Sequence, residues 1–348
     1  EYRNRTITPE KTILDAMKKM DILDKKLLLV LNNEVFVGLL SAGDIQRAII
    51  KDLPLESAVA TILRKNIRIA NPNDSFNTIK EMMLEFRMEP CPVVNHQSQI
   101  LNVYFWEDLF QEKKPQPAKM FNVPVVVMAG GIGTRLKPLT NVLPKPLIPI
   151  GDKTILEDIF ERFSSHGCNT FYVSVNYKAE LIQYYIQNQN LPYNLNFFKE
   201  EKPMGTAGSL SLLKTVINET FFVSNCDILI EQDYSEILDY HLSTKNEITI
   251  IAALKLFPVA YGILETRKDG SLISMKEKPE LAYKINTGMY LIEPSVMKYI
   301  PENKLFHITD LIEEVRNAKG KIGVFPVSQG SWKDIGEWDV LLKNFWNI

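Results

Sequence analysis

Residues 1–115 carry a repeated pattern of hydrophobic and polar positions. Apolar side chains recur at helical spacing in residues 12–20, and the same amphipathic pattern returns 63 positions downstream (12 to 75) in residues 75–83. Each predicted helix is followed by a short apolar strand, at 27–31 and at 91–94, then by a polar turn, a second strand and a second helix. The pattern therefore predicts two copies of one small α/β unit.

A different pattern begins at residue 122, where apolar runs alternate with amphipathic helices. This alternation predicts a mostly parallel sheet with helices on both faces. The predicted strands are at 123–129, 171–175, 195–198, 221–224, 248–254 and 288–292. Thr154 and Glu157 form a capping-box pattern at the start of one helix, which Gly167 should end. Both parts of the chain are therefore expected to belong to the α/β class.

The two patterns meet in a polar segment, residues 111–120, that contains two prolines. Such a composition is typical of a short, semi-rigid linker. A chain of 348 residues is also long for one domain. We therefore predict domains at 1–115 and 122–348, joined by a linker at 116–121.

Charge and cysteine content exclude several classes of protein. The chain has 40 Lys and Arg against 42 Asp and Glu, spread evenly, so it lacks the basic face that nucleic-acid binding needs. Its apolar runs, such as 248–254, are far shorter than the roughly 20 residues that cross a bilayer. Three cysteines without a C-x-x-C pair, and an N-terminus without the apolar stretch of a signal peptide, predict a cytoplasmic protein. We thus expect neither a nucleic-acid partner nor a membrane partner.

A glycine-rich turn directly follows the first strand of the second domain. Residues 130–136 are Gly-Gly-Ile-Gly-Thr-Arg-Leu, and glycines at such a turn let backbone N–H groups approach phosphate oxygens where a Cβ would collide. The dinucleotide pattern G-x-G-x-x-G is excluded because Leu136 stands in its sixth place, and the Gly-Lys-Ser/Thr of a Walker A loop is absent. A glycine-rich turn alone is a weak sign of phosphate binding.

Two cations strengthen the prediction of a phosphate site. Arg135 lies inside the glycine-rich turn, and Lys145 stands between Pro144 and Pro146, which stiffen the backbone that carries it. The alternative is a proline-rich surface turn with a solvated lysine. Because both cations share a segment with the phosphate-type turn, we expect them to bind a polyphosphate.

Two aspartates provide the oxygen ligands that a divalent cation needs in phosphoryl-transfer chemistry. Asp227 follows the buried strand predicted at 221–224, and Asp334 lies in the segment 332–336, Trp-Lys-Asp-Ile-Gly. The ends of strands are places where α/β sheets collect ligands. Cys226 has no histidine or second cysteine near it in the sequence, so we exclude it as a nucleophile or a thiolate ligand.

These motifs resemble those of the sugar-1-phosphate nucleotidyltransferases. The family's G-G-x-G-T-R-L-x-P-L-T stands at 130–140 and its P-K-P-L-x-P at 144–149, and the resemblance covers about 122–345. It implies a Rossmann-like mixed-sheet domain that joins a nucleoside triphosphate to a sugar-1-phosphate and releases pyrophosphate, with Mg²⁺ as cofactor. Arg135 and Lys145 would then be the catalytic residues, because they would bind the triphosphate and stabilise the charge that develops at the α-phosphorus.

The resemblance also assigns binding residues where this sequence matches the family's motifs. It makes Asp227 and Asp334 the metal ligands. The implied nucleotide-binding residues are Gly130, Gly131, Gly133, Thr134, Asn176, Gly205 and Thr206. The implied sugar-phosphate-binding residues are Tyr261, Gly262, Glu277, Lys278, Asn286 and Thr287. Two positions depart from the family's pattern: Cys226, where glycine is commoner, and Thr154, where proline is usual.

Residues 6–112 resemble a tandem pair of CBS motifs, whose units close with G-x-x-S/T-x-x-D-I/L. The first copy matches at 38–45, and Asp44 and Asp108 stand where that family often holds the ribose of an adenine nucleotide. The alternative is that each aspartate only caps the helix that follows it. In the second copy Asn102 replaces the glycine, which makes a bound nucleotide less favoured there. The pair would hold a regulatory nucleotide, set oligomer contacts or act as a spacer.

The segment Val175-Asn176-Tyr177 is more like the V-N-Y of guanylyltransferases than the corresponding segments of thymidylyl or uridylyl enzymes. Together with the CBS pair it resembles the CBS-fused glucosamine-1-phosphate guanylyltransferases of bacterial legionaminic acid biosynthesis. We therefore predict GTP and glucosamine-1-phosphate as substrates, GDP-glucosamine as product, and a homo-oligomer. Mannose- or heptose-1-phosphate is the alternative acceptor. A non-catalytic nucleotide-binding regulatory protein of the same fold is a further alternative, although it should have lost the cations or carboxylates.

Overall fold

The structure of the chain is a computed structural model that describes residues 2–64, 67–86, 88–109 and 119–342. Its backbone contacts form two compact bodies, unit 1 (Glu1–Gln116) and unit 2 (Pro117–Ile348). Part of the linker predicted at 116–121 lies outside the described residues.

Unit 1 contains the order strand, helix, strand, strand, helix. β1 (Thr6–Ile7) pairs in parallel with β2 (Leu27–Asn32), which pairs antiparallel with β3 (Val35–Ser41). The helices of this first copy are α1 (Ile13–Leu23) and α2 (Ala42–Ile50), with the 3-10 helices η1 (Tyr2–Arg5) before it and η2 (Val59–Ile62) after it. The helix predicted at 12–20 and the strand predicted at 27–31 are confirmed.

The same order recurs in the second copy. Ala70 bridges Val93 in parallel, at the place that β1 has in the first copy. The elements that follow are α3 (Phe76–Phe86), β4 (Pro90–Val94), β5 (Ile100–Phe105) and α4 (Trp106–Leu109). β4 and β5 pair antiparallel, as β2 and β3 do. The internal repeat predicted from the sequence is therefore a repeat of structure as well.

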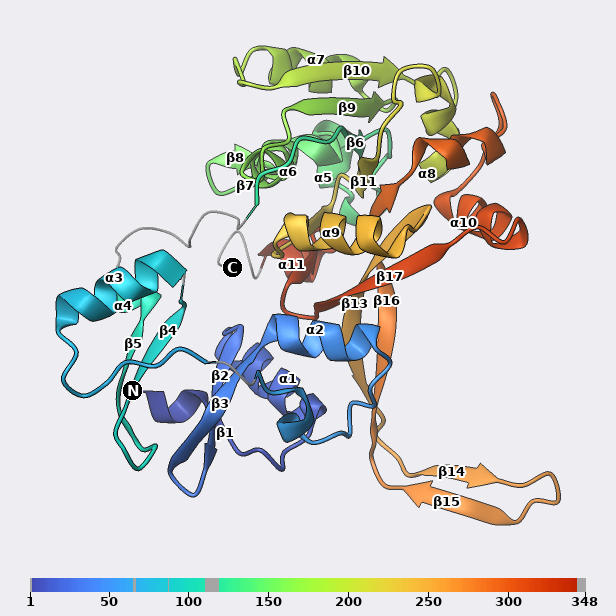
Figure 1. Ribbon diagram of the computed structural model, residues 1–348. Helices are drawn as coiled ribbons and strands as arrows, with labels where there is room; N and C mark the ends of the chain where they lie inside the picture. The colour runs from blue at the N-terminus through green and yellow to red at the C-terminus, as the bar shows by residue number, and fades with distance from the viewer. Residues whose placement is uncertain (1, 65–66, 87, 110–118, 343–348) are drawn as a thin grey trace. The chain divides into compact units, whose positions relative to one another are not determined.

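A seven-stranded mixed sheet forms the centre of unit 2, in the order β10-β9-β6-β11-β16-β13-β17 (Figure 1). Its strands are β6 (Val125–Met128), β9 (Thr170–Val175), β10 (Asn194–Lys199), β11 (Phe221–Asn225), β13 (Ile248–Pro258), β16 (Glu280–Ile292) and β17 (Ile322–Ser328). β16 runs antiparallel to both of its neighbours, and the other paired strands are parallel. All six predicted strands are present, and β17 is an additional one.

Helices cover both faces of this sheet, and each face has its own hydrophobic core. Alternate strand residues point to opposite sides, so Val125 and Val127 belong to one core and Val126 to the other. The first core is closed by α6 (Ile155–Ser164), α7 (Ala179–Gln187) and α9 (Tyr234–Thr244). The second is closed by α8 (Gly205–Gly208), η5 (Ser209–Leu213), η6 (Pro294–Tyr299) and α10 (Ile308–Asn317). The two-faced α/β layering predicted from the sequence is confirmed.

Helix α6 begins at the capping box predicted for it. The Thr154 hydroxyl oxygen accepts a hydrogen bond from the Glu157 N–H at 3.3 Å, and the Glu157 carboxylate accepts one from the Thr154 N–H at 2.8 Å. The apolar residues along one face of this helix are all buried: Ile155, Leu156, Ile159, Phe160 and Phe163. Gly167, with φ of 103°, turns the chain beyond the helix. Local sequence signals and tertiary packing agree here.

Short elements connect the sheet to the candidate site. After β6 come η3 (Thr134–Leu136), α5 (Leu139–Val142), η4 (Lys145–Leu147) and the hairpin of β7 (Pro149–Ile150) with β8 (Lys153–Thr154). β12 (Ile228–Ile230) pairs antiparallel with β18 (Trp332–Asp334), and α11 (Trp338–Leu341) follows. No helix in the described part of the chain is long and apolar enough to span a membrane.

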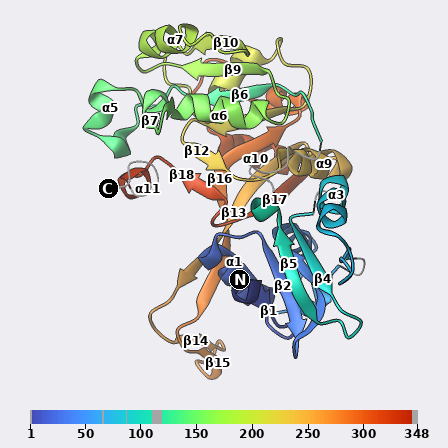
Figure 2. The same ribbon diagram turned by 90° about the vertical axis from the view of Figure 1, so that its left-hand side faces the viewer.

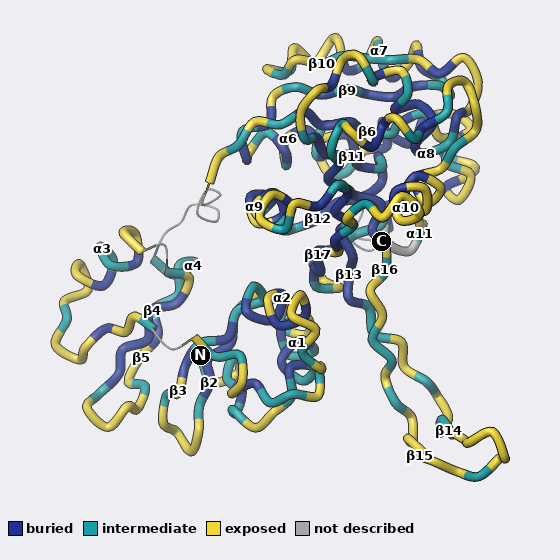
Figure 3. The backbone as a smooth tube through the Cα atoms, turned by 45° about the vertical axis from the view of Figure 1, so that its right-hand side comes forward, coloured by how far each residue is buried: buried dark blue, intermediate teal, exposed yellow. Residues whose placement is uncertain are grey.

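A long hairpin leaves the sheet at the ends of β13 and β16. It consists of β14 (Ile263–Thr266) and β15 (Leu272–Lys276), which pair antiparallel (Figure 2). Most of its residues are exposed, in contrast to the buried strands of the sheet (Figure 3). The base of this hairpin carries several of the predicted sugar-phosphate residues.

Candidate active site

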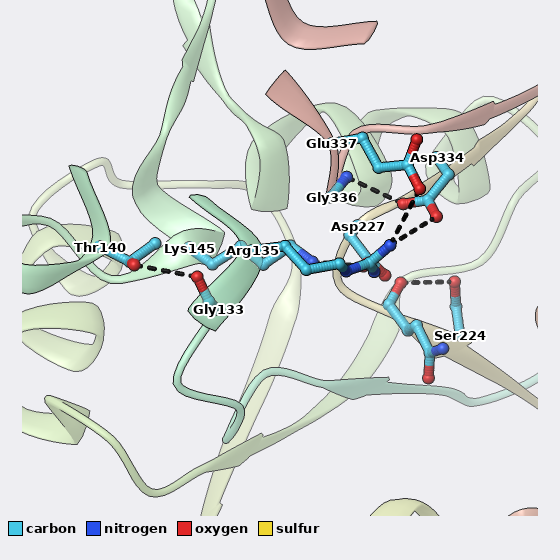
Figure 4. Close-up of polar contacts among 10 residues, drawn as sticks. Gly133, Arg135, Thr140, Lys145, Ser224, Asp227, Asp334, Gly336 and Glu337 are labelled. Carbon is cyan, nitrogen blue, oxygen red and sulfur yellow. Dashed lines mark hydrogen bonds and ion pairs between the residues drawn. The ribbon is translucent and has the colours of Figure 1, made fainter. Parts of the chain in front are cut away.

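The glycine-rich turn follows β6 and is fixed on its protein side. Gly133 has φ of 70°, and a Cβ at this position would lie 2.9 Å from Thr140 Cγ2, so the turn requires glycine. The Thr140 hydroxyl donates a hydrogen bond to the Gly133 carbonyl at 2.9 Å (Figure 4). A Cβ on Gly131 would meet no atom of the described residues within 4 Å. The protein therefore packs closely against the turn at Gly133, whereas the space beside Gly131 is free of described atoms.

Lys145 is buried and contacts Asp227. It begins η4, between the two prolines that restrict the backbone, and is 8% exposed. Its ammonium donates a hydrogen bond to Asp227 Oδ2. Burying an unpaired charge is costly, so this pairing makes the buried position of Lys145 tolerable. A stiff segment of chain therefore fixes a cation beside Asp227.

Arg135 contacts the same aspartate and a second one. Its guanidinium donates to Asp227 Oδ2 at 3.4 Å and to Asp334 Oδ2 at 3.2 Å (Figure 4). Burial alone would lower the pKa of Arg135, but the carboxylates of Asp334 and Asp227 outweigh it and raise that pKa. The Arg135 side chain is 54% exposed. In contrast to Lys145, it has open solvent beside it.

Pairing of β12 with β18 brings the two aspartates together across a long stretch of sequence. Ile228 lies opposite Asp334 in this ladder, and the Ile335 N–H donates to the Asp227 carbonyl at 2.8 Å. Asp334 Oδ1 also accepts a hydrogen bond from the Gly336 N–H at 2.8 Å. The structure thus brings together four predicted site residues: Arg135, Lys145, Asp227 and Asp334.

Two residues that follow Asp334 belong to this cluster and were not predicted. A Cβ on Gly336 would lie 2.7 Å from an Arg135 guanidinium nitrogen and 2.8 Å from carboxylate oxygens of Asp227 and Asp334. The missing side chain therefore lets these groups meet. Glu337 Oε1 accepts a hydrogen bond from Arg135 at 3.5 Å. The only sequence signal for either residue is its closeness to a predicted metal ligand.

The carboxylates of Asp227 and Asp334 fit a hard divalent cation. Mg²⁺ prefers oxygen ligands and is usually held by one or two carboxylates together with water and substrate phosphates. Within the described ranges, no cluster of three or more His, Cys, Asp and Glu side chains is arranged to hold a metal ion. The chemistry of the two aspartates is therefore compatible with a divalent cation, and their role as metal ligands stays a prediction.

Three further residues of the predicted nucleotide site make structural contacts. The Asn176 amide donates to the Glu200 carbonyl at 2.9 Å. Gly205 has φ of 79°, and a Cβ there would lie 2.6 Å from the Phe306 carbonyl oxygen. The Thr206 hydroxyl oxygen accepts a hydrogen bond from the Ile308 N–H at 3.0 Å, at the start of α10. Their contacts with base and ribose stay predictions.

Glu200 is a buried carboxylate that the sequence motifs did not mark. Its side chain accepts hydrogen bonds from the Ser174 hydroxyl at 2.6 Å and from the Met204 N–H at 2.9 Å. A Cβ on Gly130 would lie 3.3 Å from Glu200 Oε1. Glu200 therefore links β9, the segment before α8 and the first glycine of the turn.

The predicted sugar-phosphate residues fall into two groups. In β16, the Asn286 amide donates to the Tyr290 hydroxyl at 2.8 Å, and the Thr287 hydroxyl donates to the Ile251 carbonyl at 2.7 Å. The other group lies at the base of the β14–β15 hairpin: Tyr261, Gly262, Glu277 and Lys278. The side chains of the first group serve the fold, whereas most of the second group is exposed. Their contacts with a sugar stay predictions.

Cys226 is buried directly before Asp227. Burial raises the pKa of its thiol to about 12, so the thiol stays protonated near neutral pH. A protonated thiol is neither a nucleophile nor a metal ligand. This agrees with the exclusion of Cys226 from the chemistry.

In unit 1, the Asp44 carboxylate is occupied by neighbouring side chains. Asp44 Oδ2 accepts hydrogen bonds from the Ser41 N–H at 2.9 Å and from the Ser41 hydroxyl at 2.6 Å. Arg47 and Arg64 form ion pairs with Asp44 Oδ1. Burial would raise the pKa of Asp44, but hydrogen bonds from Arg64 and Ser41 outweigh it and lower that pKa. Asp44 is thus part of a capping box with Ser41 as the N-cap, and the Asp108 side chain lies outside the described residues.

Residues 124–348 match the protein family described as Nucleotidyl transferase. The matched region includes the glycine-rich turn, both cations and both aspartates of the cluster. The chain therefore belongs to the nucleotidyl transferase family. At the level of the family, the resemblance drawn from the sequence motifs is confirmed.

Curated relatives and solved structures give the similarity in more detail. The chain is 32% identical to the mannose-1-phosphate guanylyltransferase catalytic subunit beta of Drosophila melanogaster, over 64% of this chain and 61% of that protein. It is 33% identical to the mannose-1-phosphate guanyltransferase of Pichia angusta, over 61% of this chain and 60% of that protein. The match thus spans about 60% of the length of these relatives.

Among solved structures, HddC from Yersinia pseudotuberculosis is similar, with a TM-score of 0.51 and 27% identity, over 64% of this chain and 97% of that one. HddC complexed with GMP-PN is also similar, with a TM-score of 0.51 and 26% identity.

Proposed function

We propose that the chain transfers a guanylyl group from GTP to a sugar-1-phosphate and releases pyrophosphate. The observation that carries this proposal is the convergence of Arg135, Lys145, Asp227 and Asp334 at one place beside the glycine-rich turn. A binding protein that had lost catalysis would have no need to keep two cations and two carboxylates in contact. Membership of the nucleotidyl transferase family supports the same conclusion.

The proposed reaction needs no nucleophile or general base from the protein. A sugar-1-phosphate is already ionised near neutral pH, and its oxygen attacks the α-phosphorus of GTP in line. A bond forms between that oxygen and the α-phosphorus, and the bond from the α-phosphorus to the oxygen bridging the β-phosphorus breaks. Pyrophosphate leaves with the electron pair. The task of the protein is therefore positioning and charge stabilisation.

In this proposal the cations of the site offset the repulsion between two polyanions. Arg135 and Lys145 bind the triphosphate and stabilise the charge that develops at the α-phosphorus, and Lys278 binds the sugar phosphate. Enzymes of this family generally use a divalent metal ion, and we propose Mg²⁺ held by Asp227 and Asp334. When bound, the ion supplies Lewis-acid stabilisation of the phosphate oxygens.

The choice of GTP rests on three observations. The segment Val175-Asn176-Tyr177 is similar to that of guanylyltransferases. The curated relatives are named as guanylyltransferases, and HddC has been crystallised with GMP-PN. We therefore propose guanine as the base.

Two acceptors are proposed, each on its own observation. The combination of an N-terminal CBS-like pair with the guanylyltransferase motifs favours glucosamine-1-phosphate and a place in legionaminic acid biosynthesis. The names of the curated relatives favour mannose-1-phosphate. Heptose-1-phosphate is the remaining candidate from the sequence.

A pyrophosphate-release assay tests the function and the acceptor together. The enzyme is incubated with Mg²⁺, one of GTP, ATP, UTP or dTTP, and one of glucosamine-, mannose- or heptose-1-phosphate. We expect release with GTP and one acceptor, well above each single-substrate control. Silence across the whole panel would favour a non-catalytic binding protein of this fold.

We propose that unit 1 is a tandem CBS pair with a regulatory nucleotide. Its repeated order of strands and helices and the motif at 38–45 support this assignment. Asp44 would contact a ribose only if Arg47 and Arg64 gave up their ion pairs. A thermal-shift screen of adenine and guanine nucleotides, run on the full chain and on Asp44→Asn, tests it. A nucleotide that stabilises both proteins equally would show that Asp44 is not a ligand.

A further inference from the structure

The space between Asp227 and Asp334 is filled by a side chain. The Arg135 guanidinium donates to Oδ2 of both aspartates, at 3.4 and 3.2 Å. The same two carboxylates are the proposed ligands of the divalent cation. A guanidinium and a divalent cation repel one another strongly at such short range. Both cannot therefore lie between the two carboxylates at once.

We propose that Arg135 and the divalent cation are alternative occupants of the Asp227–Asp334 pair, and that Glu337 is a positioning residue that holds Arg135 there until a nucleotide arrives. This inference rests on the proposed function, from which it takes the roles of Arg135 and the aspartates. It adds an exchange of partners to that function.

Arg135 is suited to move, and Lys145 is suited to stay. The Arg135 side chain is 54% exposed, and two of its three carboxylate contacts are 3.4 Å or longer. The Lys145 side chain is only 10% exposed and contacts Asp227 at close range. Lys145 is also mounted between two prolines. The exchange is therefore expected at Arg135 alone.

Glu337 is the third acceptor of Arg135 and lies on the solvent side of the cluster. Its side chain is 60% exposed, and its Oε1 accepts from the guanidinium nitrogen that also contacts Asp334. A triphosphate offers charged oxygens that accept two hydrogen bonds from one guanidinium in bidentate geometry. Such oxygens suit a guanidinium better than one exposed carboxylate does. The arriving nucleotide thus competes with Glu337 and the aspartates for Arg135.

Metal binding to the free enzyme tests the exchange without turnover. Mn²⁺ serves as the probe, and free Mn²⁺ is measured by electron paramagnetic resonance with no nucleotide present. We expect Arg135→Gln to bind Mn²⁺ about tenfold or more tightly than the wild type, because the competing cation is gone. Lys137→Gln is the matched control, since Lys137 is an exposed cation of the same segment. Its Mn²⁺ affinity should change by about twofold at most.

Equal gains in Arg135→Gln and Lys137→Gln would show that only net charge matters and would overturn the exchange. No gain in Arg135→Gln would overturn it as well. Omitting the nucleotide matters, because GTP chelates Mn²⁺ in solution and would mimic the coupling.

Nucleotide binding without metal tests the role of Glu337. A non-hydrolysable GTP analogue is titrated in EDTA onto the wild type, Glu337→Gln and Glu337→Asp. Aspartate keeps the charge but is one methylene too short to reach Arg135. We expect both variants to bind the analogue about two- to fivefold more tightly, since Arg135 is released more easily. Wild-type affinity in Glu337→Asp would show a charge effect only and would overturn the positioning role.

The failure of this inference can be told from the failure of the proposed function. A wild type that releases pyrophosphate, with Mn²⁺ affinity unchanged in Arg135→Gln, would overturn the exchange and leave the function standing. A wild type without turnover across the substrate panel would remove the function on which the exchange rests.

Discussion

Asp227 accepts hydrogen bonds from both cations of the site, Arg135 and Lys145, so its negative charge offsets part of their positive charge. We expect Asp227→Asn to lower pyrophosphate release about a hundredfold or more, because the amide keeps the shape of the side chain but loses the negative charge that pairs with Lys145 and that we propose holds the metal ion. Circular dichroism should show an intact fold. Asp239→Asn is the control, since Asp239 is an exposed aspartate paired with Lys119. An Asp227→Asn enzyme of normal activity would remove Asp227 from the metal role.

Alanine substitutions at Gly131 and Gly133 test ligand contact and folding separately. A Cβ on Gly131 meets no atom of the described chain within 4 Å, so Gly131→Ala should melt at the wild-type temperature. If phosphate oxygens approach this backbone, the same variant should bind GTP about tenfold more weakly. Gly133→Ala should instead lower the melting temperature, because its Cβ would press on Thr140. Unchanged GTP affinity in Gly131→Ala would place the phosphates elsewhere.

At the scale of elements, a buried polar network joins α9, β13 and the segment after β16. His241 contacts the Thr249 hydroxyl at 2.8 Å and the Glu293 carboxylate at 3.0 Å. The same Glu293 oxygen accepts a hydrogen bond from the hydroxyl of Thr220, the residue before β11, at 2.6 Å. Burial lowers the pKa of His241, and the Glu293 carboxylate opposes this only in part. The folded protein therefore favours the neutral imidazole.

This network predicts a loss of stability in mild acid. The unfolded chain takes up a proton on His241 near pH 6.5, whereas the folded chain resists it, so the stabilisation is present above that pH and is lost as the pH falls through the folded pKa. We expect the melting temperature of His241→Gln to depend less on pH between 7.5 and 5 than that of the wild type. His96→Gln, at an exposed histidine, is the control. Equal pH dependence in wild type and His241→Gln would assign the acid sensitivity to other groups.

The strands of the central sheet that the sequence predicted are mostly apolar, and β17, the strand of that sheet that it missed, shows why this matters. β17 contains Gly323 and Pro326, which disfavour a strand in a local pattern. Its place at the edge of the sheet makes Pro326 acceptable, and that place is a property of the whole sheet. The first half of β16 carries polar and charged residues, because residues 280–286 extend beyond the buried sheet.

The candidate site was predictable only where a motif marks it. Arg135 and Lys145 share a dense local pattern, and Asp227 ends a strand that periodicity reveals. No local sequence pattern marks Glu337 or Glu200, because each contacts residues that lie far away in the sequence. Asp44 is the opposite case. A motif marks its position, but in the structure its carboxylate forms ion pairs with two arginines.

At the scale of the molecule, all of the proposed catalytic residues lie in unit 2, and its two cores consist of its own residues. We therefore expect a fragment of residues 119–348 to fold and to retain pyrophosphate release within about threefold of the full chain. Circular dichroism checks the fold, and the release assay checks the activity. A folded but inactive fragment would show that unit 1 contributes to turnover.

The ladder between β12 and β18 has a consequence for synthesis on the ribosome. A nascent chain that has emerged as far as Asp227 already contains the glycine-rich turn and both cations, yet its second acidic group is still unmade. Domains form largely as units while translation proceeds. If Asp334 has the role proposed for it, an incomplete polypeptide is inert because of its own topology, and the proposed reaction begins only after the strand bearing Asp334 has left the exit tunnel.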